Sequence, residues 1–182
     1  MSIDPQLVGT WTLDPAHSRL GFSSRHAMVT KVRGAFNEVS GTAVIDAEDW
    51  ARSSVRVSIE VASVDTRNAQ RDEHLRTSDF FDAEHHPRIE FDSTSIDEVD
   101  ENQLIVVGDL SIRGITRPIS VPLELMGVDT DPFGHLRVGF EGSRRIDRKD
   151  WGVSWNTPLD SGGVLVSDKI TLEFELSLTK DG

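Results

Sequence analysis

The chain has 182 residues, of which 37% are hydrophobic and 27% charged, with a formal net charge of −12 at pH 7. This length fits one domain over residues 1–182, with a core of about 8–179. The acidic balance argues against nucleic acid as a partner, because phosphates need clusters of Lys and Arg. The absence of cysteine excludes disulfides, thiolate metal sites and cysteine nucleophiles.

The N-terminal stretch, MSIDPQLVGTWTL, has no basic region followed by an apolar run, so it does not match a secretory signal peptide. No segment has the run of about 20 apolar residues that a transmembrane helix needs. We therefore expect a cytoplasmic protein that does not insert stably into a membrane.

Alternation of apolar and polar residues with period two predicts β-strands along most of the chain. In chain order they cover residues 7–13, 17–25, 32–39, 42–46 and 55–61, then 88–92, 104–112, 115–126, 136–141 and 170–178. We interpret 32–46 as a hairpin with Ser40-Gly41 at its bend. Long antiparallel strands with one wet face must curl around a shared interior. The pattern therefore predicts an all-β fold, a single closed antiparallel barrel of roughly eight strands with room for packed side chains or one ligand.

Residues 66–93 break this alternation. The stretch around residues 67–82 is predicted to be a short helical insert, because Asp72 precedes Arg76 by four positions. Phe80 and Phe81 follow together, and Pro87 ends the irregular part. Two interpretations stay open: a plug or lid on the β-structure, or a surface crossover whose aromatic rings anchor it to the core.

Catalytic and metal-binding patterns are weak. None of the six histidines forms an H-x-H or H-E-x-x-H motif, and the adjacent His85 and His86 would point to opposite faces of a strand. We interpret His26 as a buried residue that satisfies a backbone group. There is no G-x-S-x-G, no P-loop and no G-x-G-x-x-G. We therefore predict no catalytic residues, no metal and no cofactor.

Residues 144–157, RRIDRKDWGVSWNT, combine cations with two tryptophans. One interpretation is a solvated hairpin whose Trp151 and Trp155 pack on the barrel rim. The other is a mouth at which Arg144, Arg145 or Arg148 meets the polar or anionic head of a ligand with an apolar tail.

Several motifs together resemble the YceI-like, polyisoprenoid-binding family, in order and with similar spacing over about residues 8–179. They are WTLDPAHS at 11–18 with Phe22 and His26, GAF at 34–36 with Gly41, SVDT at 63–66, RDEHLR at 71–76, DFFDA at 79–83 with Pro87, Ile89 and Phe91, GDLSIRGIT at 108–116, RKDWG at 148–152, and the last strand from VSD at 166–168.

This resemblance implies a lipocalin-like, eight-stranded antiparallel barrel around a long apolar ligand, such as a polyisoprenoid, an isoprenoid quinone or a fatty-acid derivative. Family members are often homodimers, and many are periplasmic, whereas this sequence shows no export signal. Trp151 stands where the family pattern leads us to expect phenylalanine, which alters the pocket if the ring faces inward.

The predicted function is non-enzymatic binding, transport or sequestration of such a lipid, held by about 25 cal/mol per Å² of apolar surface buried. Two alternatives remain: an enzyme acting on the lipid through His17, His26 or His74, and a ligand-free interaction protein with a solid core. Phe80 and Phe81 would close one end of the barrel, and Arg144 or Arg148 would meet the head group. The other predicted ligand contacts are Phe22, His26, Phe36, Val57, Ile59, Phe91, Leu110, Leu123, Phe140, Trp151 and Phe174.

Overall fold

The structure is a computed structural model that describes residues 3–27, 29–159 and 165–181. Its one α-helix in these ranges, α1, spans Ala69–Arg76, and five short 3-10 helices are Pro5–Leu7 (η1), Pro15–His17 (η2), Trp50–Arg52 (η3), Val61–Ser63 (η4) and Arg148–Trp151 (η5). The strands are β1 (Gly9–Leu13), β2 (Arg19–His26), β3 (Thr30–Phe36), β4 (Val39–Ile45), β5 (Ser54–Glu60), β6 (Val64–Asp65), β7 (Arg88–Asp100), β8 (Gln103–Ile112), β9 (Ile115–Thr130), β10 (Leu136–Asp147) and β11 (Lys169–Lys180).

Eight of these strands close into an antiparallel barrel. Their order is β1-β4-β5-β7-β8-β9-β10-β11, and β11 pairs back with β1. Strand β2 continues along β11 beyond β1, and β3 pairs with β2 and with β6. The predicted all-β, eight-stranded barrel with a short helical insert is confirmed.

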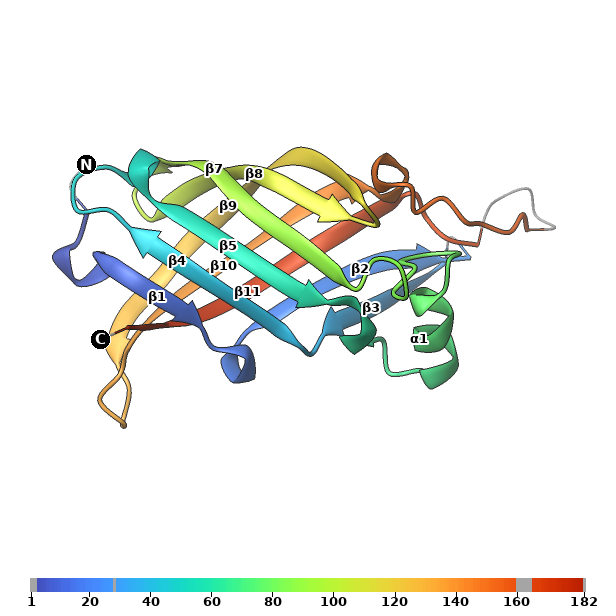
Figure 1. The fold of residues 1–182 in the computed structure, drawn as a ribbon, viewed down its shortest axis with the longest axis horizontal. Coiled ribbons are helices and arrows are strands. Elements are labelled where there is room, and N and C mark those ends of the chain that lie inside the picture. The colour runs from blue at the N-terminus through green and yellow to red at the C-terminus, as the bar shows by residue number, and fades with distance from the viewer. Residues whose placement is uncertain (1–2, 28, 160–164, 182) are drawn as a thin grey trace.

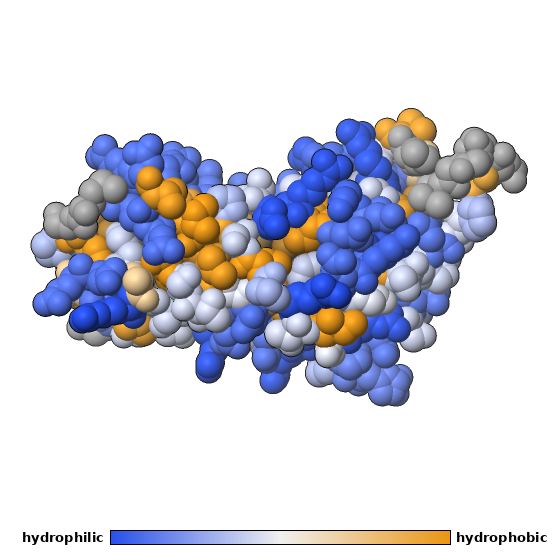
Figure 2. Space-filling view, turned by 90° about the horizontal axis from the view of Figure 1, so that it is seen from above, coloured by the Kyte–Doolittle hydropathy of each residue, from blue (hydrophilic) through white to orange (hydrophobic). Residues whose placement is uncertain are grey.

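The barrel has two different ends (Figure 1). Both chain termini lie at one end, and α1 lies at the other, beside the β2–β3 hairpin. We call these the terminal end and the helical end. Seen from above, the outer surface is largely hydrophilic, with apolar surface across its middle (Figure 2). None of the described helices combines the length and the hydropathy that crossing a membrane would require.

The predicted hairpin at 32–46 is wrong. Strands β1 and β2 run in the same direction, because both are antiparallel to β11. Since β4 is antiparallel to β1 and β3 is antiparallel to β2, β3 and β4 also run in the same direction and cannot form a hairpin. The chain bends between them at Asn37-Glu38, and Gly41 lies inside β4. A Cβ atom at Gly41 would lie 3.0 Å from the backbone oxygen of Arg56. The glycine therefore marks a close approach of two strands and not a turn.

The terminal end is filled by side chains. Trp11 is 0% exposed and Val138 1%, and the two pack in one core with Leu13 and Leu178. The indole Nε1 of Trp11 donates to the backbone oxygen of Leu7 at 2.7 Å. A large ring with its one polar atom satisfied helps to fill the interior at this end. The interior cavity nearer this end has a volume of about 60 Å³, against about 200 Å³ for the one toward the other end.

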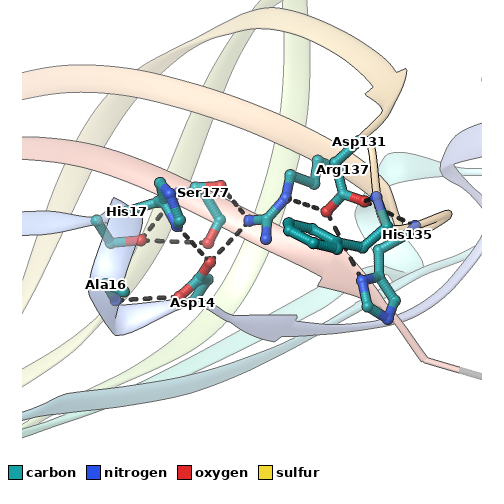
Figure 3. A network of polar contacts seen from close by, with 9 residues as sticks. Asp14, Ala16, His17, Asp131, His135, Arg137 and Ser177 are labelled. Carbon is teal, nitrogen blue, oxygen red and sulfur yellow. Dashed lines mark hydrogen bonds and ion pairs between the residues drawn. The ribbon is translucent and has the colours of Figure 1, made fainter.

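A polar network fastens the outside of the terminal end (Figure 3). The Arg137 guanidinium donates from Nη1 to Asp14 Oδ2 and from Nε to Asp131 Oδ2, both at 2.7 Å. Asp131 Oδ1 accepts the backbone N–H groups of Phe133 and His135 at 2.8 and 3.0 Å. The hydrogen bond from His135, aided by Arg137, lowers the pKa of Asp131 from 3.8 to about 2. The β9–β10 loop is thereby tied to the turn before η2.

Candidate ligand-binding site

An apolar cavity of about 200 Å³ lies inside the barrel toward the helical end. Its wall comes from most strands of the barrel, from β2 and β3, from α1 and the segment after it, and from the region of η5. Ser24 and Arg148 are the only lining side chains that carry a hydroxyl or a charge. The volume far exceeds the ~10–15 Å³ that one water needs, and a cavity with so few polar partners favours hydrocarbon over water.

Most of the predicted contact residues surround this cavity. Most of them lie on strands, where period-two alternation places them on inward faces. Phe80 and Phe81 lie after α1, and Arg148 and Trp151 belong to η5. Those that line it are Phe22, Phe36, Val57, Ile59, Phe80, Phe81, Phe91, Leu110, Leu123, Arg148, Trp151 and Phe174. That they contact a ligand stays a prediction.

Three predicted residues lie elsewhere. His26 is exposed at the end of β2, so its expected burial is wrong. Phe140 faces inward and is 8% exposed, but it borders a second cavity of about 60 Å³ that Leu13 and Leu178 also line, nearer the terminal end. Arg144 is exposed and is not part of the cavity wall.

Other lining residues were not predicted. Several share the inward phase of strands already identified, so the same alternation contains the signal for them: Ile119, Val121, Ile146, Ile170, Leu172 and Leu176. Leu75 has no such signal, since it is one apolar residue in a polar helix. It reaches the cavity because α1 is laid against the barrel end.

Hydrogen bonds from side chains fix the start of α1. Asn68 Oδ1 accepts the backbone N–H of Arg71 at 3.1 Å, which caps the helix. The buried Asp72 accepts two hydrogen bonds from Thr66, from its backbone N–H at 2.8 Å and from its hydroxyl at 2.6 Å. Arg71 donates from Nε and Nη2 to the hydroxyl and backbone oxygens of Thr66, both at 2.7 Å, and Arg76 Nε donates to the Ala62 oxygen at 3.0 Å. Polar bonds such as these, together with Leu75, hold a helix that buries little apolar surface.

The two phenylalanines after α1 close the helical end. The Phe81 ring packs edge-on against Phe36, with centroids 5.7 Å apart, and both rings line the cavity. Arg113, at the β8–β9 turn, donates from Nη1 to the backbone oxygens of Ser78 and Phe80 at 2.6 Å. This geometry favours the plug over a surface crossover, because the aromatic rings form part of the cavity wall.

His74 links the elements over this end. Its Nε2 lies 2.8 Å from Asp79 Oδ2, and its ring packs edge-on against Phe80 and Trp155, with centroids 5.0 and 4.9 Å away. The histidine therefore joins α1, the segment after it and the loop after η5. It packs behind the wall of the cavity and is not among the residues that line it.

Arg148 anchors the loop that follows η5. Its Nε donates to the Ser167 oxygen at 2.9 Å, and its Nη1 donates to the oxygens of Val153 and Trp155 at 2.7 and 2.9 Å. Burial lowers the pKa of the Arg148 guanidinium. Because these backbone oxygens engage its donors, Arg148 is an anchor for the loop and is poorly placed to bind a head group.

Trp151 also combines a structural bond with a place in the wall. It is 3% exposed, its ring lines the cavity, and its Nε1 donates to the backbone oxygen of Leu110 at 2.9 Å. The ring faces inward, so this residue shapes the cavity.

Sequence comparisons agree with the fold. The model of the YceI-like domain matches residues 11–178. A UPF0312 protein of Photorhabdus laumondii is 38% identical over 135 residues, which cover 74% of this chain and 70% of that protein. Protein YceI of Escherichia coli O157:H7 is 36% identical over 137 residues, covering 75% and 71% of the two chains.

Solved structures show the same barrel. BcnA of Burkholderia cenocepacia superposes with a TM-score of 0.79 at 26% identity, covering 91% of this chain and 98% of that one. A polyisoprenoid binding domain from Saccharophagus degradans gives a TM-score of 0.71 over 94% and 98% of the chains, and at 16% identity that likeness concerns the fold. With the family model matching nearly its whole length, the chain belongs to the YceI-like family.

Proposed function

We propose that this protein binds a long apolar ligand inside its barrel, without acting on it chemically, and so carries or sequesters it. The single observation that supports this proposal most is the apolar cavity of about 200 Å³. The ligand class is a polyisoprenoid, an isoprenoid quinone or a fatty-acid derivative. The solved polyisoprenoid binding domain with the same barrel supports this class. Burial of the chain supplies the affinity, at about 25 cal/mol per Å².

The positions of the three histidines considered as acid–base groups also support a binding protein. His17 is exposed and lies at the terminal end beside Asp14, 2.7 Å away. His26 is exposed, and His74 packs between Phe80 and Trp155. None of them lines the cavity, whereas a general acid or base must come within hydrogen-bond reach of its substrate.

The test is mass spectrometry of organic extracts from the purified protein, with a variant that fills the cavity. Val57→Phe adds a ring at a lining position, and Val99→Phe adds the same ring at a position that is 61% exposed on β7. We expect a stoichiometric prenyl or acyl species with the wild type and with Val99→Phe, and its loss with Val57→Phe.

Stability measured on the same samples separates filling from unfolding. A ring that enters empty space leaves the free energy of unfolding of Val57→Phe near that of the wild type. The proposal fails if the wild type yields no lipid and also fails to bind added prenyl quinones, or if Val57→Phe retains the ligand in full. A cytoplasmic location and homodimerisation stay proposals, tested by fractionation and by light scattering.

A further inference from the structure

Two neighbouring strands of the barrel share a hydrogen-bonded ladder over only part of their length. Strands β9 and β10 pair from Leu136↔Thr130 to Glu141↔Glu124, and no further. Beyond that point β10 stays paired with β11 as far as Asp147, and β9 stays paired with β8 as far as Ile115. The facing edges of 115–123 and 142–147 therefore have no ladder between them. We call these two segments the seam.

Two prolines explain the seam. Pro118 and Pro122 lie four residues apart on β9 and have no N–H group to donate. The backbone oxygen of Pro122 lies toward Gly142 of β10, and the N–H and C=O of one strand residue point to the same side. The bond that Pro122 lacks, and that Pro118 lacks in the same phase, is therefore one that would point toward β10. Gly142 sits beside Pro122, where any Cβ atom would collide with the proline oxygen. The strands therefore approach at Gly142 and lack ladder bonds beyond it.

Arg144 occupies an inward position beside the seam. On β10 it alternates in phase with Phe140, Gly142 and Ile146, and its direct partner on β11 is Leu172. Ile146 and Leu172 both line the cavity. Arg144 is nevertheless exposed. Its side chain starts on the cavity face of the wall and reaches solvent, as expected for a residue at an opening.

Arg117 repeats this arrangement on the other strand of the seam. Its direct partner on β8 is Leu110, and its neighbour in phase along β9 is Ile119; both line the cavity. Arg117 is exposed as well. If the β9–β10 register continued, Arg144 would face Val121, four residues and about 13 Å along the strand from Arg117. Two long side chains can reach one group between them.

The charges of these arginines are uncompensated within the described ranges. Neither side chain forms an ion pair or a hydrogen bond with another described residue, although the chain carries a net charge of −12. By contrast, Arg137 lies between two carboxylates and Arg148 is held by backbone oxygens. The guanidinium groups of Arg117 and Arg144 are exposed and start from positions beside the apolar cavity. Guanidinium groups bind carboxylate and phosphate in a bidentate manner.

We propose that Arg117 and Arg144 form the head-group site of an anionic amphiphile, whose carboxylate or phosphate lies at the seam while its apolar chain fills the cavity. This proposal rests on the proposed function and narrows its ligand class. The uncharged head of a quinone or an alcohol would not use these two charges.

The test compares ligands that share one tail. Dissociation constants are measured by calorimetry at low salt for dodecanoic acid, dodecyl phosphate and dodecanol, with inorganic phosphate as a fourth probe. The proteins are the wild type, the double variant Arg117→Gln/Arg144→Gln, and a control, Arg33→Gln, at an exposed arginine of β3. Circular dichroism confirms that each is folded.

We expect the wild type and the control to bind at least one of the two anionic ligands about tenfold more tightly than dodecanol. The double variant should lose this preference and bind dodecanol as the wild type does. The acid and the phosphate, compared with each other, identify the head group. Equal affinity of the wild type for all three lipids overturns the proposal, as does an unchanged preference in the double variant or inorganic phosphate binding as tightly as the lipids. If dodecanol and the anions all fail to bind, the proposed function itself fails, and this proposal with it.

Discussion

The two ends of the barrel are built from the same alternating strands but differ inside. At the terminal end, Trp11 and Val138 are almost completely buried, and the remaining void is about 60 Å³. At the helical end, Phe22 and Phe174 surround a void of about 200 Å³. The difference lies in how each end is closed. One end is closed by a large ring from the barrel itself, and the other by Phe80 and Phe81 from an inserted segment, which cover the space without filling it.

The largest expected effect comes from emptying the filled end. Trp11→Ala should lower the free energy of unfolding by about 3–5 kcal/mol, because it leaves a cavity in a closely packed core. Phe22→Ala, beside a cavity that already exists, should cost clearly less. Chemical denaturation of both variants measures the difference. Equal losses would contradict the distinction between a filled and a hollow end.

A second comparison separates two arginines near the helical end. Arg148→Lys should destabilise the protein by about 1–3 kcal/mol, because lysine cannot satisfy the backbone oxygens of Val153, Trp155 and Ser167 together. Arg144→Lys, at an exposed position, is the matched control and should leave stability unchanged. Hydrogen exchange should rise at 153–157 in the first variant only. Unchanged exchange there would show that Arg148 is not the anchor of the loop.

The polar network around Asp131, on the outside of the terminal end, predicts that the stability of the protein falls at acidic pH. The pKa of Asp131 is lowered from 3.8 to about 2 in the folded protein, so its contribution to stability is complete above about pH 4 and is lost as the pH falls through 2. Asp131→Asn removes this contribution. Its free energy of unfolding should therefore fall less than that of the wild type between pH 4 and pH 2. Parallel curves for the two proteins would show that the carboxylate does not carry the effect.

The smallest effect concerns the outer wall between the ends. Glu141 lies directly opposite Glu124 on one side and Glu175 on the other, and like charges in such positions repel. Glu141→Gln should stabilise the protein by about 0.2–1 kcal/mol, less at high salt, and should leave ligand binding unchanged. A loss of stability, or no dependence on salt, would argue against repulsion along this row.

Much of the barrel was predictable, because period two identifies inward residues on each strand. Val57, Phe91 and Leu110 were found in this way and line the cavity. Alternation does not say how far along the axis a residue lies, so Phe140 was wrongly placed with them. Alternation also did not show that β3 and β4 pair with other strands and not with each other. Gly41 is a residue type typical of turns, but here it allows a close contact between β4 and β5.

Charged residues were harder to interpret. Arg144 and Arg148 are four positions apart in one basic stretch, yet one is exposed and the other is buried and bound to backbone oxygens. That difference arises from the backbone oxygens of Val153, Trp155 and Ser167, whose positions around Arg148 the sequence pattern does not give. The seam did leave a signal, since Pro118 and Pro122 stand in an otherwise regular strand.

We expect the hollow end of the barrel to hold the tail of the ligand. The most direct measurement is a crystal structure with dodecanol that carries a bromine on its last carbon, located by the anomalous scattering of the bromine. The bromine should occupy one site inside the cavity, among Phe22, Val57 and Leu110. Bromine found only on the outer surface, or at no ordered position at saturating ligand, would contradict this expectation.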